Sequence, residues 1–316
     1  MRIAIFGTGG VGGYFGAQLA RAGQDVVFIA RGEHLRAIRE HGLKLETPTG
    51  EVLIKPATAT DDPAQVGEVD VVLVALKAWQ VADAARAMLP MIGRNTTVVP
   101  LQNGVEAPAQ LAGVLGAEHV MGGLCGTISM VVGPGRIHTM VGPGFSSFVR
   151  FGELDKRLTA RAERLLEAFA STPVKAEIAS DISRAMWEKF LFVSSFGGMG
   201  LLTRAPAGII RTVSETRTLL ERCMQEVHAV ARARKVALAD TVVADTMAFV
   251  DSLPAGATTS LQRDIADGKR SELDEWNGAV VRLGRDVGVA APMHELIYHT
   301  ALPSELRARG ELKFPA

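Results

Sequence analysis

The chain has 316 residues, of which 47% are hydrophobic and 22% are charged, with 34 basic and 34 acidic side chains. This length allows two domains, and the composition is typical of a globular protein, not of a disordered or fibrous one. The balanced charge gives no indication of a polyanionic partner, so we expect no binding of nucleic acid.

Two cysteines, Cys125 and Cys223, lie far apart and have no metal-ligand spacing. We therefore expect two buried apolar thiols and no metal site. The chain opens with a strand pattern that runs directly into glycines, which leaves no room for a signal peptide. No later stretch is long and apolar enough to span a bilayer. These features favour a cytoplasmic protein that does not bind membranes.

The first 30 residues predict a strand, a glycine turn, a helix and a second strand. Residues 3–6 are apolar, and the turn that follows fits G-x-G-x-x-G with Gly7, Thr8, Gly9, Gly10, Val11 and Gly12. In such a unit the glycines permit a tight turn and a close approach of backbone to a pyrophosphate, which binds at the helix N-terminus. The alternative is a glycine turn without a ligand. The position of the motif between a strand and a helix favours a dinucleotide site.

The end of the second predicted strand, residues 25–30, bears on the choice of cofactor. A site for NAD(H) wants an acidic residue there to hold the ribose 2′-hydroxyl, whereas this chain has Arg31. A guanidinium suits a 2′-phosphate, although a solvated surface arginine is the simpler alternative. The sequence therefore favours NADP(H).

Further strand patterns follow in the N-terminal half. Residues 43–45 and 52–54 flank a Pro-Thr-Gly turn and predict a hairpin, and residues 71–76 and 97–101 predict two buried strands. Lys77 and Asn103 follow these two strands. Because ligands bind beyond the carboxyl ends of parallel strands, we expect both side chains to face the cofactor, although Asn103-Gly104 also suits a plain turn.

Residues 120–149 alternate short apolar runs with glycines, among them the Gly-Pro-Gly at 142–144, which predicts antiparallel strands that complete the sheet. A helix over 157–169 and a strand over 174–178 are expected next. From about residue 181 the pattern becomes helical, with helices predicted over 183–195, 214–235, 261–266 and 272–287. The fold class is thus α/β, with a Rossmann-type dinucleotide-binding domain (1–178) followed by an all-helical substrate domain (179–316).

Two segments of the helical half could carry chemistry. Lys189 stands among apolar residues and either snorkels to the surface or points into a cleft, and the residues alone favour snorkelling. Glu272 follows Ser271, a suitable N-cap with Asp274 in the capping-box position. Its simplest role is that of a first-turn acid favoured by the helix dipole.

Taken together, these segments resemble the ketopantoate reductase (2-dehydropantoate 2-reductase) family over nearly the whole chain. The resemblance rests on the opening glycine-rich segment 7–23, Arg31, the Lys-Ala-Trp-Gln at 77–80, the Gln-Asn-Gly at 102–104, the Trp-Glu-Lys at 187–189 and the run 259–278. It implies reduction of ketopantoate to pantoate by NADPH, the reaction of pantothenate biosynthesis.

The resemblance also implies roles for individual residues. The family's proton donor matches Lys189, and an active-site carboxylate matches Glu272. The positions of Lys77 and Asn103 contact NADPH, and substrate is held at Asn103, Lys189 and Ser260. A protonated lysine suits this chemistry, because it can stabilise the charge that grows on a carbonyl oxygen and then deliver a proton.

The chain departs from the family at three substrate asparagines, whose places are taken by Val193, Gly197 and, by an ungapped count, Ala207. A pocket without these amides is more apolar, and hydrogen bonds of this kind discriminate strongly between substrates. The alternatives are therefore a related reductase of a more apolar 2-oxo acid or ketone, and a non-catalytic NADP(H)-binding sensor. Retention of Lys189 and Glu272 argues against the sensor. Helical second domains of this sort often pair, which suggests a homodimer.

Overall fold

The computed structural model describes residues 1–141 and 146–315. The chain divides into two compact units. The sheet unit comprises Met1–Gln102 and Ala107–Ile182, and the helical unit comprises Asn103–Glu106 and Ser183–Ala316. The short segment Asn103–Glu106 therefore belongs by its contacts to the helical unit, although it follows a strand of the sheet.

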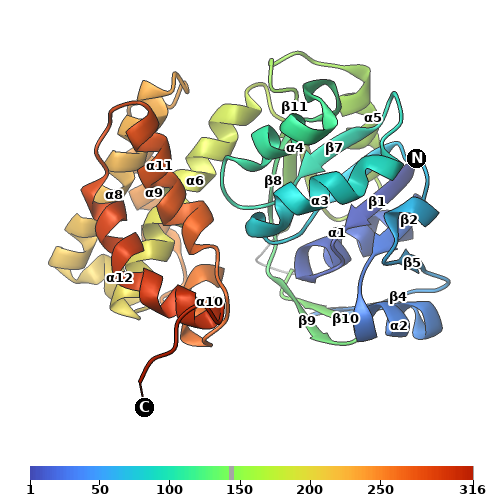
Figure 1. Ribbon diagram of the computed structural model, residues 1–316, viewed down its shortest axis with the longest axis horizontal. Helices are drawn as coiled ribbons and strands as arrows, with labels where there is room; N and C mark the ends of the chain where they lie inside the picture. The colour runs from blue at the N-terminus through green and yellow to red at the C-terminus, as the bar shows by residue number, and fades with distance from the viewer. Residues whose placement is uncertain (142–145, 316) are drawn as a thin grey trace. The chain divides into compact units, whose positions relative to one another are not determined.

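The centre of the sheet unit is a five-stranded parallel sheet in the order β5-β2-β1-β6-β7 (Figure 1). This is the doubly wound order in which the chain reverses direction beside β1, and ligands bind there in folds of this class. The parallel sheet with helices confirms the predicted Rossmann-type fold. Its strands are β1 (Arg2–Phe6), β2 (Asp25–Ile29), β5 (Thr58–Thr60), β6 (Val71–Val74) and β7 (Thr97–Pro100).

Both faces of this sheet are covered, which explains why its strands are almost wholly apolar. On one face, Ile3 and Ile5 of β1 pack in a core with α1 (Gly10–Arg21). On the other face, Ala4 and Phe6 pack in a core with α3 (Val81–Met88) and α4 (Ala107–Leu115). The remaining long helices of this unit are α2 (Gly32–His41) and α5 (Ala160–Phe169).

The later strands do not complete the parallel sheet, so that expectation is wrong. They form two further sheets, β4-β3-β10-β9 and β12-β11-β8, and join the parallel sheet only by a bridge from Val98 to Val120 among the described residues. The predicted hairpin over β3 and β4 is confirmed, and β10 adds to it in parallel. Alternating apolar residues predict a strand but not the strand it pairs with, which depends on long-range packing.

The Gly-Pro-Gly at 142–144 lies outside the described residues. The bounds are β3 (Leu43–Thr47), β4 (Gly50–Ile54), β8 (Gly122–Gly126), β9 (Ser129–Gly133), β10 (Arg136–Thr139), β11 (Phe148–Gly152) and β12 (Lys175–Ile178).

The helical unit has a single apolar core to which its helices contribute. The predicted helix over 183–195 is longer than expected, because α6 (Ile182–Thr203) continues through its glycines. No helix of the described chain is both long and apolar enough to cross a membrane. The other helices are α7 (Ala207–Thr212), α8 (Ser214–Ala233), α9 (Val242–Ser252), α10 (Ser260–Ala266), the π-helix η5 (Asp274–Gly278), α11 (Ala279–Asp286) and α12 (Pro292–Ala308).

Candidate active site

The glycine turn between β1 and α1 has the geometry of a phosphate cradle. Gly7 has a φ of 103°, which favours glycine, and a Cβ at Gly12 would lie 2.0 Å from the Gly7 carbonyl oxygen. A Cβ at Gly9, by contrast, would meet nothing within 4 Å. Gly9 is also the N-cap of α1 and makes no side-chain cap, so the first N–H groups of the helix are open to an anion. These residues fit the pyrophosphate of a dinucleotide.

The end of β2 is fixed against this turn. The backbone N–H and the hydroxyl of Thr8 both donate to the carbonyl oxygen of Ile29, at 3.1 and 3.0 Å. Two residues later, Arg31 is exposed and is the N-cap of α2. Arg31 therefore stands at a helix N-terminus, where partial positive charge favours an anion such as a phosphate, and its guanidinium adds a full positive charge.

Lys77 and Asn103 follow the neighbouring parallel strands β6 and β7 at their carboxyl ends. Between them, the buried amide of Gln102 donates to the carbonyl oxygens of Val74 and Leu76, at 2.9 and 3.2 Å. Lys77 lies over the ring of Trp79, with its Nζ 5.7 Å from the ring centroid. The structure thus places Lys77 at the strand ends, as the sequence predicts, and leaves the contacts of both residues with a cofactor as predictions.

In the helical unit, Lys189 lies on α6 and is half-buried. Val193 and Gly197 follow it at intervals of four residues, so the three positions share one face of the helix. Val193 is buried. The neighbouring Glu188 forms an ion pair with Arg184, one turn earlier on the same helix, at 2.7 Å.

Glu272 is 6% exposed and lies two residues before the first residue of the π-helix η5. A π-helical turn is rare, occurs mostly inside α-helices and is frequently found at functional sites. The predicted helix over 272–287 is thus divided into η5 and α11. The sequence gives no clear sign of this division, because one widened turn hardly changes the apolar period.

The segment that carries Glu272 is held by the last helix, α12. The fully buried carboxylate of Glu305 accepts hydrogen bonds from the Ser271 N–H at 3.0 Å and from the Ser271 hydroxyl at 2.6 Å, and it also accepts from Arg309 at 2.8 Å. Asp274 accepts from Tyr298 and Arg309, both at 2.5 Å. The expected capping box is therefore wrong, since Asp274 is engaged by α12 instead of the Ser271 backbone. The Ser271 hydroxyl does accept from the Leu273 N–H at 3.3 Å, as an N-cap would.

Two adjacent glycines let η5 approach α6. A Cβ at Gly197 would lie 2.8 Å from Cζ3 of Trp276, and a Cβ at Gly198 would lie 2.6 Å from Nδ2 of Asn277. Asn277 also donates to the carbonyl oxygen of Ser194 at 3.2 Å. The helix that carries Lys189 and the segment that carries Glu272 are therefore in direct contact within one unit.

Two further substrate positions of the family lie in the same unit. Ser260 is the first residue of α10, and the next residue, Leu261, reaches to 3.4 Å from a Cβ at Gly197. The start of α10, which carries Ser260, therefore packs against α6 through Leu261. Ala207 does not present its side chain to an open pocket, because it has no exposed surface and belongs to the apolar core. Its N–H donates to the carbonyl oxygen of Ala257 at 3.0 Å.

Sequence reasoning missed Glu275 on η5. Burial, together with the nearby carboxylates of Asp274 and Glu272, raises the pKa of Glu275 to about 7. Its Oε2 is buried and has no hydrogen-bond partner among the described residues. The carbonyl oxygen of Glu275 lies 3.4 Å from a Cβ at Gly104, so the loop that bears Asn103 packs beside it. The only signal in the sequence is a run of three acids, 272, 274 and 275, within four residues.

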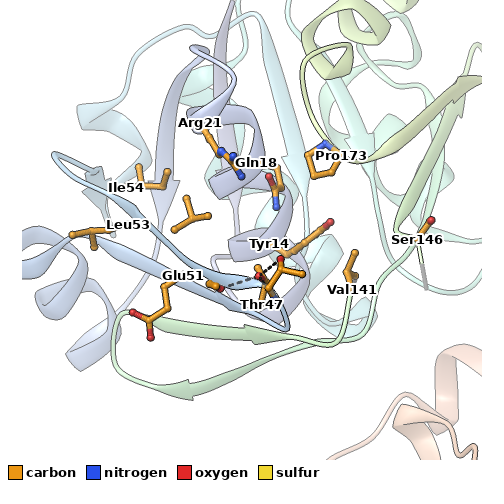
Figure 2. A pocket seen from close by; sticks show the side chains of 13 residues that line it. Tyr14, Gln18, Arg21, Thr47, Glu51, Leu53, Ile54, Val141, Ser146 and Pro173 are labelled. Carbon is orange, nitrogen blue, oxygen red and sulfur yellow. Dashed lines mark hydrogen bonds between the residues drawn. The ribbon is translucent and has the colours of Figure 1, made fainter. Parts of the chain in front are cut away.

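A cavity of about 740 Å³ in the sheet unit is lined by other residues (Figure 2). Figure 2 shows Tyr14, Gln18 and Arg21 of α1 on one side of it and the β3–β4 hairpin on the other. No residue predicted to bind cofactor or substrate lines this cavity. It is therefore not the candidate active site.

The sequence matches two family models, "Ketopantoate reductase PanE/ApbA" over residues 3–155 and "Ketopantoate reductase PanE/ApbA C terminal" over residues 181–303. A curated 2-dehydropantoate 2-reductase of Mesorhizobium japonicum is 31% identical to this chain, and the match covers 92% of this chain and 94% of the relative. The two models together span both units of the fold.

Solved structures agree with this assignment. The crystal structure of a PanE/ApbA family ketopantoate reductase from Ralstonia eutropha JMP134 has a TM-score of 0.88 and 30% identity, and the match covers 98% of this chain and all of that one. A D-mandelate dehydrogenase with NADH and anilino(oxo)acetate also has a TM-score of 0.88 at 23% identity, covering 98% of this chain and 99% of that one, which shows a shared fold alone. The chain therefore belongs to the ketopantoate reductase family and is an oxidoreductase with a site for a nucleotide cofactor.

Proposed function

We propose that this enzyme reduces the carbonyl group of a 2-oxo acid with NADPH, with Lys189 as the proton donor and Glu272 as its active-site partner. The observation that carries the proposal is the direct contact between α6 and η5 through Gly197 and Trp276. This contact holds the helix that bears Lys189 against the segment that bears Glu272. Family membership supplies the reaction class.

The proposed cofactor is NADP(H). Open N–H groups at the start of α1 and the clear space over Gly9 suit its pyrophosphate. An exposed Arg31 at the N-terminus of α2 suits its 2′-phosphate, because both the guanidinium and the helix end favour an anion. In addition, Lys77 and Asn103 are proposed to contact the cofactor at the ends of β6 and β7.

When bound, the nicotinamide supplies a hydride to the carbonyl carbon of the substrate. The ammonium of Lys189 is proposed to donate a hydrogen bond to the carbonyl oxygen, where negative charge grows, and then to transfer a proton from Nζ to that oxygen. A mostly buried carboxylate at Glu272 can accept a hydrogen bond from the ammonium or from a substrate hydroxyl and so orient it. Ser260 is proposed to hold the substrate.

Two substrates follow from different observations. The names of the relatives favour ketopantoate, with pantoate as product, as in pantothenate biosynthesis. Val193 and Gly197, which stand where the family has substrate asparagines, favour a paralogous reductase of a more apolar 2-oxo acid or ketone, whereas Ala207 lies in the apolar core. A non-catalytic NADP(H) sensor is the weaker candidate, because a sensor needs neither Lys189 nor Glu272.

A spectrophotometric assay of NADPH oxidation with a panel of 2-oxo acids tests the reaction. Lys189→Ala should lower kcat by about 10²- to 10⁴-fold, the usual contribution of a positioned proton donor. Lys313→Ala removes an exposed lysine of the same unit and should leave kcat unchanged. Unimpaired turnover in Lys189→Ala would exclude this lysine as the donor, and tight NADPH binding without turnover of any compound would favour the sensor.

The cofactor is tested by Arg31→Asp. Loss of a hydrogen bond to a charged group costs about 1.5–3 kcal/mol, so the preference for NADPH over NADH in kcat/KM should fall by roughly 10- to 150-fold. Arg36→Asp, which changes an exposed arginine on the same helix, is the matched control. An unchanged preference in Arg31→Asp would contradict the proposed 2′-phosphate site.

A further inference from the structure

The loop Asn103–Glu106 packs within the helical unit, although the chain on both of its sides belongs to the sheet unit. It follows β7 and is followed directly by α4. Gly104 has a φ of 108°, which favours glycine, and a Cβ there would lie 3.4 Å from the carbonyl oxygen of Glu275. Val105 packs against the apolar core of the helical unit. The loop is therefore held by contacts with the helical unit.

The last residue of this loop is bound by Arg282 of α11. Nη2 of Arg282 donates to a carboxylate oxygen of Glu106 and to the carbonyl oxygen of Asp274, both at 3.0 Å. A Cβ at Gly278 would lie 3.1 Å from Nη1, so this glycine leaves room for the guanidinium. One guanidinium thus joins the loop after β7 to η5, which begins two residues after Glu272.

The ion pair between Arg282 and Glu106 is too exposed to contribute much to folding. Their side chains are 47% and 28% exposed, and pairs of this kind add little to stability. A guanidinium nevertheless holds two acceptors in a fixed planar geometry, which a single ammonium does not. Its two contacts therefore set the direction of the loop. Asn103, at the other end of the loop, is half-buried and lies at the carboxyl edge of the sheet, where ligands bind in folds of this class.

From these contacts we propose that Arg282 is a positioning residue for Asn103. It acts through Glu106 and holds the amide of Asn103 in place for the cofactor or the substrate. The inference rests on the proposed function, which gives Asn103 that contact. Asn103 then works as part of the unit that bears Lys189 and Glu272, although it follows a strand of the sheet. A displacement of about 1 Å in such a group can lower the rate by about 100-fold.

Arg282→Ala tests this role in the full chain. We expect kcat/KM with NADPH and a 2-oxo acid to fall by about 10-fold or more. The Kd for NADPH, measured by titration calorimetry, should rise by about 2- to 10-fold, the factor that one hydrogen bond contributes. Tm should fall by less than about 4 °C, because the ion pair is exposed. Arg285→Ala removes another exposed arginine of α11 and, as the matched control, should leave all three values as in the wild type.

The variant Asn103→Ala separates positioning from a general structural role. Once the amide is absent, adding Arg282→Ala should change kcat/KM and Kd by less than about twofold. Glu106→Ala breaks the same pair from the loop and should reproduce the effect of Arg282→Ala, so it provides the test if that variant does not fold. Arg282→Lys keeps the charge without the double contact and should recover only part of the loss.

Each other outcome has a separate meaning. Wild-type values in Arg282→Ala, together with a loss in Asn103→Ala, would overturn the inference and leave the proposed function intact. Losses that multiply in the double variant would also overturn it, because Arg282 would then act through another group. Wild-type values in Asn103→Ala would refute the proposed contact of Asn103, and the inference with it. If the wild type binds NADPH but turns over no 2-oxo acid, the proposed reductase is refuted and the Kd values alone decide the inference.

Discussion

Replacement of Glu275 by glutamine should stabilise the protein in mild alkali and have little effect in mild acid. The carboxyl of Glu275 titrates near 4.5 when the chain is unfolded and near 7 in the folded helical unit, where burial opposes its charge. Between these pH values the folded state holds a proton that the unfolded state has released. Stability therefore declines as pH rises from about 4.5 to 7, and the cost is complete above pH 7.

The size of this effect follows from the shift. The rise of the pKa from 4.5 to about 7 corresponds to a loss of at most about 3 kcal/mol in the free energy of unfolding once the carboxyl is charged. Solvent screening of the partly exposed side chain reduces this loss to about 1–2 kcal/mol. Glutamine keeps the shape of Glu275 and removes its charge. We expect Tm at pH 8 to rise by about 3–8 °C and Tm at pH 5 to change by less than about 1 °C.

Thermal unfolding is followed by tryptophan fluorescence, since Trp187 and Trp276 are both buried in the helical unit. Glu311→Gln changes an exposed glutamate of the same unit and should leave the difference between pH 5 and pH 8 as in the wild type. Asp274 offers a contrast of opposite sign. Burial raises its pKa, but hydrogen bonds from Tyr298 and Arg309 outweigh burial and lower it overall, so Asp274→Asn should destabilise the protein at pH 8.

If Tm of the Glu275→Gln variant differed from that of the wild type by the same amount at every pH from 5 to 8, the reasoning would be refuted. It would mean that Glu275 is already charged at pH 5 and that its burial is offset by the surrounding charges.

Three further predictions concern folding and reactivity. Gly12→Ala places a methyl group 2.0 Å from the carbonyl oxygen of the first glycine and should lower Tm, whereas Gly9→Ala meets open space and should weaken NADPH binding in titration calorimetry without lowering Tm. Glu305→Ala leaves buried donors such as Ser271 unpaired and should cost about 3–5 kcal/mol in urea unfolding; a loss below about 1 kcal/mol would contradict the role of this carboxylate. Burial raises the pKa of Cys223 to about 12, so its thiol should not react with a disulfide reagent at pH 8 until the chain unfolds, as peptide mapping can show.

The sequence by itself determined the features that depend on local backbone demands. The turn from Gly7 to Gly12 requires glycine at fixed spacings, so its conformation and its fit to a dinucleotide can be predicted from the sequence. The place of Arg31 can be predicted in the same way, because the residue lies two positions after the last residue of β2. The apolar runs of β1, β6 and β7 likewise indicate burial on both faces and hence a parallel sheet.

Only the tertiary structure decided which strands pair and what fills each buried volume. The pattern of residues 120–149 indicates strands, but packing places them in two additional sheets. Asp274 suits a capping box in the sequence, yet α12 supplies stronger partners from 24 and 35 residues away. From the sequence, Gly197 indicates only that an asparagine side chain is missing. The structure shows that Trp276, which is distant in sequence, packs against the position where that side chain would begin. Local periods fix the type of each element, whereas partners and volumes depend on contacts between distant segments, which no short pattern encodes.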